Sequence, residues 1–433
     1  MTSTPLSSTS RAIVLHPALK FDRNHSDHQA RLDEAVGLAL AIDLIIAAAD
    51  VIPLAAITPR TYIGSGKVEE LKTLVEVQEA GLVIMDCTIS PVQQRNLEKA
   101  WNCKVIDRTA LILEIFGQRA RTGEGKLQVD LAALEYQKSR LVRSWTHLER
   151  QRGGFGFMGG PGETQIESDR RVIGEQITKI KLELETVKRT RQLHRHARKT
   201  VPYPIVALVG YTNAGKSTLF NKLTGAQVMA EDKLFATLDP TMRQVVLPSK
   251  RKVILSDTVG FISDLPTELI AAFRATLEEV TEADLLLHIR DSSHPATAQQ
   301  KKDVLQVLIN LGLEKDLETK MIEVLNKTDL LADGYHGKTS PHHVAISALS
   351  GDNIPALLEM IDEMLGADDQ HVIVTLEAHD GKLLSWIYQH AEVLERRETD
   401  DHITIAIHIA DKEHAQLIHH AAESGAKIKK RHE

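Results

Sequence analysis

Residues 210–218, GYTNAGKST, have the spacing of glycine, lysine and hydroxyl groups that is typical of a phosphate-binding loop. The apolar run PIVALV precedes them and the helical run STLFNKL follows, which is the strand-to-helix setting that such a loop needs. Glycines let successive backbone N–H groups turn toward phosphate oxygens, Lys216 can neutralise the β- and γ-phosphates, and Ser217 can ligate Mg²⁺. The residues that we expect to contact nucleotide here are Gly210, Tyr211, Thr212, Asn213, Ala214, Gly215, Lys216, Ser217 and Thr218.

Two further segments predict that the nucleotide is a guanine nucleotide. KVILSD ends at Asp257, which can hold Mg²⁺ through water, and the N–H of Gly260 can sense a γ-phosphate. VLNKTD ends at Asp329, whose carboxylate can accept hydrogen bonds from guanine N1–H and N2–H₂, and adenine cannot satisfy it. VAISALSG follows, and we expect its Ser347 and Ala348 to lie behind the guanine base. The contacts expected from these segments are Asp257, Thr258, Val259, Gly260, Asn326, Lys327, Asp329, Ser347, Ala348 and Leu349.

The segment LFATLDPT, residues 234–241, is the candidate switch loop, in which Thr237 can close over Mg²⁺ and the γ-phosphate. A threonine in an ordinary loop is the alternative. The expected Mg²⁺ ligands are therefore Ser217, Thr237 and Asp257, and the expected catalytic groups are Lys216, Thr237 and Gly260. Asn213 is a candidate ligand for K⁺, or a residue that only stabilises the loop.

The residue after DTVG is Phe261, where many GTP-hydrolysing proteins have a glutamine that orients the attacking water. A phenylalanine ring neither donates nor accepts the hydrogen bonds of that glutamine. The sequence therefore predicts a low intrinsic rate of hydrolysis. It leaves open whether a partner orders the switch loops or backbone groups hold the water.

Strand-like and helical runs alternate in residues 11–117 and again after residue 201, which is typical of parallel α/β sheets. Between them two apolar seams flank RGGFGFMGGPGE, residues 152–163, and predict an antiparallel helical hairpin. The last segment reads strand, helix, strand pair, helix. We therefore expect a multidomain α/β protein, with an N-terminal parallel α/β domain (1–117), a helical hairpin with a glycine-rich tip (118–200), a Ras-like P-loop G domain of the TRAFAC class (201–367) and a small α+β ferredoxin-like C-terminal domain (368–433).

The hairpin carries a charge opposite to that of the whole chain. Residues 137–200 contain fifteen Lys or Arg against seven Asp or Glu, a local excess of eight positive charges, whereas the chain has a net charge of −7. KRTRQLHRHARK, residues 188–199, is the densest part. A solvated helix face is the alternative, but the one-sided charge favours RNA phosphate as the partner.

A turn in the N-terminal domain, GSGK at residues 64–67, is superficially similar to a phosphate loop. Thr61 and Val68 stand where the motif requires glycine and Ser or Thr. We expect the turn to cap the helix that begins near Lys67. The alternative is an anion site at that helix N-terminus.

The composition is that of a soluble globular protein with reduced thiols. Cys87 and Cys103 form no CxxC pattern, and the polar start MTSTPLSSTS is not a signal peptide. The apolar stretch at residues 35–56 contains two aspartates, each of which would cost about 2.5–3.5 kcal/mol at the centre of a membrane span. We expect a cytoplasmic monomer without a membrane span, which can associate peripherally with the membrane.

The chain resembles the HflX family of ribosome-associated GTPases over nearly its whole length. The resemblance rests on YIGSGKVEEL, on LVRSWTHLERQRGGFGFMGGPGETQIESDRR and, in the G domain, on LFATLDPT and DTVGF. It implies binding to the large ribosomal subunit, GTP hydrolysis stimulated by that subunit, and separation of stalled or idle ribosomes under stress. It also implies that the hairpin, with its tip at residues 153–162, reaches toward the peptidyl-transferase centre.

Two other functions stay open at this point. One is a ribosome-assembly GTPase that acts on immature large subunits. The other is a regulatory switch whose GTP state controls a protein partner such as a protease. The basic hairpin favours the functions that involve ribosomal RNA.

Overall fold

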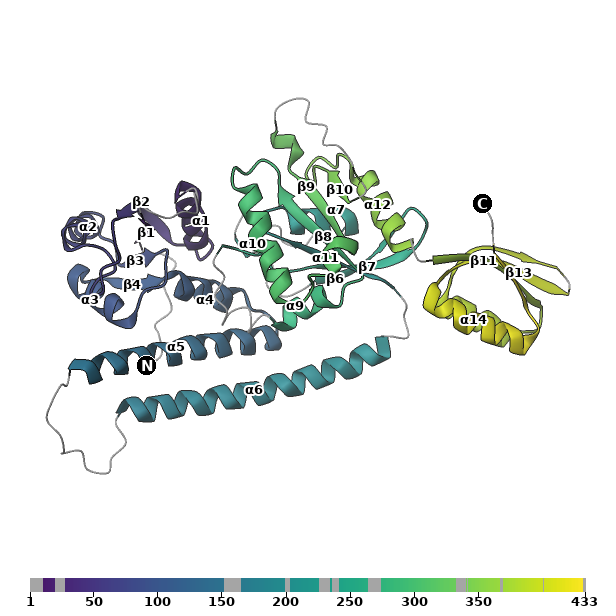
Figure 1. Cartoon of the computed structure of the whole chain (residues 1–433), viewed down its shortest axis with the longest axis horizontal. Helices are drawn as coiled ribbons and strands as arrows, with labels where there is room; N and C mark the ends of the chain where they lie inside the picture. Colours follow the sequence, from purple (N-terminus) through teal and green to yellow (C-terminus); the bar gives the residue numbers. More distant parts are fainter. Residues whose placement is uncertain are drawn as a thin grey trace.

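The computed structural model describes residues 11–19, 28–151, 165–198, 203–225, 234–235, 241–263, 274–331, 340, 342–366, 369–399 and 401–430. Thr237 and the predicted hairpin tip, residues 153–162, lie outside these ranges. Within them three separate sheets and a pair of long helices follow one another along the chain (Figure 1). The protein is multidomain α/β, as predicted.

The first sheet is parallel throughout, with strand order β2-β1-β3-β4. Helices cover both faces, because the strands are buried on both sides. The start of helix α3 is set by adjacent residues: Ser90 and Gln93 form a capping box, and Pro91 is the first residue of the helix. The elements are β1 (Arg11–Leu19), α1 (His28–Leu40), β2 (Ile45–Leu54), α2 (Ser65–Val77), β3 (Leu82–Met85), α3 (Pro91–Trp101), β4 (Lys104–Asp107) and α4 (Arg108–Arg119).

The GSGK turn leads directly into helix α2, which begins at Ser65. Lys67 lies 2.7 Å from a carboxylate oxygen of Glu70 and 3.6 Å from one of Asp50. The lysine of this turn is therefore engaged by carboxylates of its own domain.

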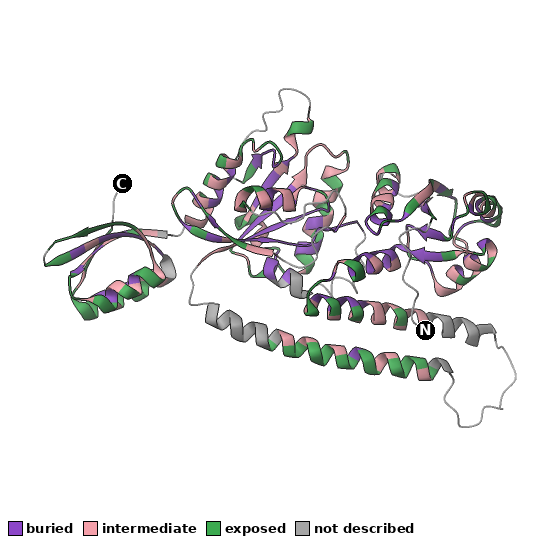
Figure 2. Cartoon of the chain, turned by 180° about the vertical axis from the view of Figure 1, so that it is seen from behind, coloured by how far each residue is buried: buried purple, intermediate pink, exposed green. Residues whose placement is uncertain are grey.

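The hairpin consists of α5 (Gly123–Gln151) and α6 (Gln165–Arg198), which lie side by side along the N-terminal and G domains (Figure 1). The apolar seam of α6 faces α5, and Ile177 is buried there. Helix α5 has a second face that sequence periodicity did not reveal. Val129 and Ala132 on that face are buried in the core of the N-terminal domain, so α5 is anchored, whereas most of the α6 residues whose exposure the structure describes are exposed (Figure 2).

The second sheet has the order β10-β9-β8-β5-β7-β6 and is parallel except for the β6–β7 pair. Its carboxyl ends meet at the turn after β5, which is where α/β sheets bind ligands. The elements are β5 (Ile205–Gly210), α7 (Lys216–Thr224), β6 (Thr241–Val246), β7 (Lys252–Asp257), α9 (Arg274–Thr281), β8 (Leu285–Asp291), α10 (Thr297–Asn310), α11 (Asp316–Thr319), β9 (Met321–Asn326), the 3₁₀ turn η1 (Thr328–Leu330), β10 (His343–Ala345) and α12 (Ile354–Gly366).

The C-terminal sheet is antiparallel, with the order β12-β13-β11-β14 and two helices, which is the ferredoxin-like arrangement. The sequence analysis missed its last strand, because KIKK at residues 427–430 alternates around a single apolar residue. The elements are β11 (Asp369–Glu377), α13 (Gly381–His390), β12 (Glu392–Glu398), β13 (His402–Ala410), α14 (Asp411–Ser424) and β14 (Lys427–Lys430).

One hydrophobic core extends across the boundary between the N-terminal and G domains. It joins residues of β1, α1 and α4 to residues around the phosphate loop, including Tyr211, Phe235 and Phe261. The C-terminal domain has a core of its own. We therefore expect the first two sheets to behave as one body and the C-terminal domain to unfold separately.

Ile405→Ala should destabilise the C-terminal domain by about 2–5 kcal/mol, because Ile405 is fully buried in its core and the change leaves a cavity. Urea unfolding should show this loss in one transition, with GDP binding retained. Ile418→Ala, at a residue that is 50% exposed in the same domain, is the control and should change stability by less than about 0.5 kcal/mol. Loss of GDP binding in Ile405→Ala would contradict separate unfolding.

Candidate functional site

The phosphate loop lies between β5 and α7 and closes against the strand end of β9. Gly215 has φ +94°, and a Cβ atom there would lie 2.2 Å from Nδ2 of Asn326. Only glycine fits, since both the left-handed backbone and the close approach exclude a side chain. Asn213 also has positive φ, 59°, a conformation that asparagine tolerates well.

Lys216 is buried beneath this loop. Its Nζ donates hydrogen bonds to the carbonyl oxygens of Gly210, at 3.1 Å, and Tyr211, at 2.7 Å. Burial lowers the pKa of Lys216 to about 8, and the nearby charge of Asp257 offsets this only in part. An anion bound beside Lys216 would favour the charged ammonium form and so raise this pKa again.

Ser217 and Asp257 come together across the sheet as the metal prediction requires. The Ser217 hydroxyl donates to Oδ2 of Asp257 at 2.7 Å, and Asp257 is fully buried at the end of β7. Two hard oxygen donors beside a phosphate loop suit Mg²⁺. Thr237, the third expected ligand, lies outside the described residues.

The predicted base-recognition residues lie at the ends of β9 and β10. Asn326 joins two loops, because its amide donates to the Ala214 carbonyl at 2.8 Å and accepts from the Ala348 N–H at 2.9 Å. Ser347 donates to Oδ1 of Asp329 at 2.6 Å and so fixes the carboxylate. That carboxylate is exposed, as a group that meets a base must be.

The other two residues predicted here have different surroundings. Lys327 has a left-handed backbone, φ 64°, and pairs with Asp291 at 2.8 Å. Leu349 is 76% exposed. Lys327 is thus tied to the end of β8, whereas the Leu349 side chain lies at the surface.

Residues 257–261 continue from β7 onto the phosphate loop. Thr258 is buried and donates its hydroxyl to the Leu208 carbonyl at 2.5 Å. Gly260 approaches so closely that a Cβ there would lie 2.7 Å from Cγ2 of Thr212. The Phe261 carbonyl accepts from the Thr212 N–H at 2.7 Å, and the Phe261 side chain is 3% exposed in the core shared with the N-terminal domain. Phe261 is therefore a packing residue in this conformation.

Sequence reasoning missed three residues that adjoin the site, Glu34, Arg108 and Ser263, and it missed the contacts that Tyr211 makes with them. The Tyr211 hydroxyl donates to Glu34 and accepts from the Ser263 N–H, and Arg108 donates to Ser263. Glu34 and Arg108 belong to the N-terminal domain and carry no local motif. The sequence signals were weak: a tyrosine in a loop rich in small residues, and a charged pair, Asp107 and Arg108, inside an apolar run.

Both the fold and the strand-end residues are those of a P-loop GTP hydrolase. Family models match four consecutive stretches of the chain. They are described as GTP-binding GTPase N-terminal (residues 29–117), GTP-binding GTPase middle region (119–198), 50S ribosome-binding GTPase (205–327) and HflX C-terminal domain (335–431).

Relatives of known family extend this result. The GTPase HflX of Magnetococcus marinus is 49% identical over 407 residues, with 92% of each chain covered. That of Escherichia coli is 45% identical over 336 residues, with 76% of this chain and 78% of the relative covered. The chain belongs to the HflX family of GTPases. A GTP-binding protein of Sulfolobus solfataricus, crystallised with GDP, is 22% identical with a TM-score of 0.44, covering 82% of this chain and 98% of that one.

Asp329→Asn should lose preference for GTP and gain relative affinity for xanthosine triphosphate. A site built to hydrogen-bond a group rejects analogues that lack it by about 10⁴–10⁵-fold, and the amide matches xanthine instead. Competition between the two nucleotides measures the change. Asp316→Asn, in a surface ion pair with Lys320, is the control. Unchanged GTP affinity in Asp329→Asn would exclude this loop as the base site.

Nucleotide binding should take up a proton near pH 8.5. Burial holds the pKa of Lys216 at about 8, so much of the free protein carries a neutral amine there, while bound phosphate favours the ammonium form. Affinity for GDP should therefore fall as the pH rises through 8. Titration calorimetry in two buffers of different ionisation enthalpy measures the uptake. Lys216→Arg should abolish it, because a guanidinium stays charged. Wild-type binding without uptake would contradict this role of Lys216.

Proposed function

We propose that this GTP hydrolase binds the large ribosomal subunit and uses GTP binding and hydrolysis to separate stalled or idle ribosomes under stress. The observation that carries the proposal is the hairpin. Helices of 29 and 34 residues run along the body, and much of the outer face of α6 is exposed. Such a projection suits insertion into a large particle. Membership of a family of ribosome-binding GTPases and the expected cytoplasmic location support it.

The charges along the hairpin suggest where it meets RNA. In the described middle of α6, opposite charges pair, as in Arg171 with Glu175 and Lys181 with Glu135 of α5. Residues 188–198 of the basic run lie at the G-domain end of α6. The glycine-rich tip at residues 153–162 contains no Lys or Arg. The stem near the G domain is therefore the proposed source of electrostatic affinity, and the tip is the proposed wedge.

At the nucleotide site, the proposed roles follow the contacts. Lys216 and the backbone of residues 210–218 hold the phosphates, Asp329 selects guanine, and Ser217, Thr237 and Asp257 hold Mg²⁺. The metal supplies charge compensation for the phosphates when bound. Gly260 senses the γ-phosphate. A K⁺ ion at Asn213 stays a prediction, since the positive φ of Asn213 already accounts for asparagine there.

Large ribosomal subunits should raise GTP hydrolysis by at least about tenfold, equivalent to roughly 1.4 kcal/mol of barrier. Phe261→Leu should keep most of this stimulation, because the buried ring packs and makes no polar contact. Phe220→Leu, at another buried phenylalanine of the G domain, is the control for the general cost of such a change. Hydrolysis by the protein alone at the stimulated rate would contradict activation by the ribosome.

Replacing the tip, residues 153–162, by a short turn should leave subunit binding and much of the stimulated hydrolysis intact while ribosome separation falls sharply. The tip has no cationic side chain to release counterions, so its contribution is geometric. Sedimentation, GTP turnover and light scattering measure binding, hydrolysis and separation on the same protein.

Lys188→Gln with Arg189→Gln is the matched variant for the stem. It should weaken binding and reduce the slope of affinity against salt by about two, because two phosphate contacts are lost. Equal loss of hydrolysis and separation in the tip variant, or loss of neither, would refute this division of roles. Preference for immature over mature subunits in sedimentation would favour the assembly function.

A further inference from the structure

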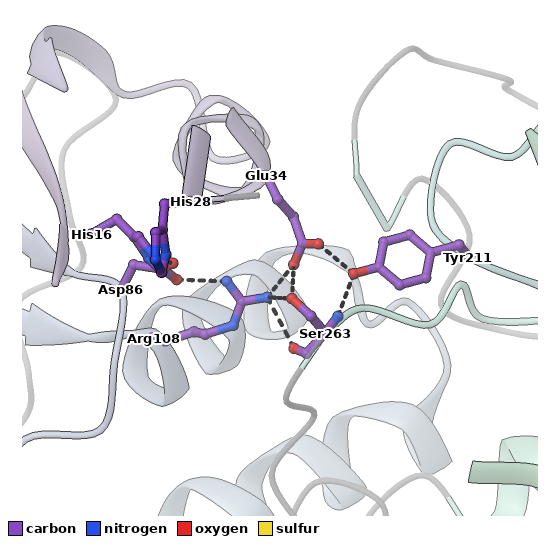
Figure 3. Close-up of polar contacts among 7 residues, drawn as sticks. All are labelled: His16, His28, Glu34, Asp86, Arg108, Tyr211 and Ser263. Atoms are coloured by element: carbon purple, nitrogen blue, oxygen red, sulfur yellow. Dashed lines mark hydrogen bonds and ion pairs between the residues drawn. The ribbon is translucent and has the colours of Figure 1, made fainter. Parts of the chain in front are cut away.

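The N-terminal domain contacts the segment that follows Gly260 through a buried polar network (Figure 3). Arg108 donates from Nη2 to the backbone oxygen of Ser263, at 3.0 Å, and to its hydroxyl, at 3.1 Å. Glu34 accepts from the Ser263 hydroxyl at 2.9 Å and from the Tyr211 hydroxyl. Tyr211 in turn accepts from the Ser263 N–H. We call Glu34, Arg108, Tyr211 and Ser263 the latch.

The latch is held from behind by the N-terminal domain. Nη1 of Arg108 donates to Asp86 at 2.6 Å, and the other oxygen of Asp86 lies 2.8 Å from Nδ1 of His16. Burial disfavours the charge on Arg108, but attraction to Asp86 and Glu34 outweighs it and raises the pKa of the guanidinium. The N-terminal domain thus fixes the guanidinium of Arg108, and this guanidinium sets the position of Ser263 in the G domain.

The same domain also holds the start of the other predicted switch segment. Phe235 packs edge-on against Phe116 of α4, with ring centroids 4.7 Å apart. Leu234 lies so close to α1 that a Cβ on Gly37 would be 3.1 Å from its Cδ1. Phe235 is two residues before Thr237, so the N-terminal domain contacts the chain beside both groups expected to respond to a γ-phosphate.

The latched segment lies close to the phosphate-binding lysine. The Phe261 N–H donates to the Gly210 carbonyl at 3.1 Å, and its carbonyl accepts from Thr212. A Cβ on Gly260 would be only 3.0 Å from Nζ of Lys216, which is itself turned to the loop carbonyls. Oxygens of a third phosphate bound to Lys216 would have to share this space with Gly260.

We propose that Glu34, Arg108 and Tyr211 are positioning residues that set the preference between GDP and GTP. Through Ser263 they hold Gly260 against the phosphate loop, which favours GDP, and a third phosphate must draw this segment away from the N-terminal domain. Because coupling is reciprocal, whatever loosens the N-terminal domain from the G domain also raises affinity for GTP relative to GDP. The proposal rests on the GTPase site and not on the ribosomal role.

Two isosteric variants test the latch on the full-length protein without ribosomes. Tyr211→Phe removes the hydroxyl that joins Glu34 to Ser263 but keeps the ring in the core, and Glu34→Gln removes the charge. In each, the ratio of the GDP dissociation constant to that of a non-hydrolysable GTP analogue should rise by about tenfold or more, as expected for loss of one charge-assisted hydrogen bond. Fluorescent nucleotides measure both constants.

The matched control is Tyr136→Phe. Its hydroxyl also donates to a carboxylate, Asp107 at 2.7 Å, but within the N-terminal part of the chain. It should leave the ratio unchanged. Tyr211→Phe and Glu34→Gln should also be non-additive when combined, because both change the hydrogen bond between Tyr211 and Glu34.

Three results would overturn the proposal. The first is an equal change in both dissociation constants, which is what a merely structural role produces. The second is a shift toward GDP. The third is full additivity of the two variants. Thermal unfolding of each variant separates loss of fold from loss of the latch.

Discussion

The buried guanidinium of Arg108 is the constraint on which the arrangement of the first two sheets depends. A cation taken out of water is costly unless it is paired with opposite charge, and the two terminal nitrogens of Arg108 meet carboxylates of Asp86 and Glu34 together with two oxygens of Ser263. Two of these partners belong to the N-terminal domain and the third to the G domain. Asp86 and Glu34 compensate the charge within the N-terminal domain, whereas the hydrogen bonds to Ser263 form only when the domains are docked, so they favour one docked geometry.

Apolar packing also holds the N-terminal and G domains together at this boundary. The core around Phe116, Phe235 and Phe261 belongs to neither domain alone. It also accounts for an unusual feature of the sequence, a phenylalanine in place of the glutamine of many GTP hydrolases. In this fold that side chain closes the domain boundary. In our proposal the reaction chemistry falls to the backbone of Gly260, to Thr237 and to the ribosome.

The sequence predicted the parts of the site whose residues are contiguous and end a strand. Each of three motifs directly follows an apolar run that predicts a strand: GYTNAGKST, SDTVG and VLNKTD. Because parallel strands end at the same edge of a sheet, the motifs are expected to meet there. The latch could not be predicted in this way. Arg108 and Ser263 are 155 residues apart, Glu34 and Ser263 are 229 apart, and neither Glu34 nor Arg108 belongs to a motif. The second face of α5 was missed because its buried residues, Val129 and Ala132, are small, and β14 was missed because it has a single apolar residue, Ile428.

The geometry of α6 has a mechanical consequence. A helix of 34 residues is about 50 Å long, and only six residues separate its end from β5, the central strand that leads into the phosphate loop. A tilt of about ten degrees at that end would carry the far end through roughly 9 Å, given the same rise per residue. Helix α6 is in effect a lever that is joined to the amino end of β5, so a small rotation of the G domain at that end would become a large displacement at the far end.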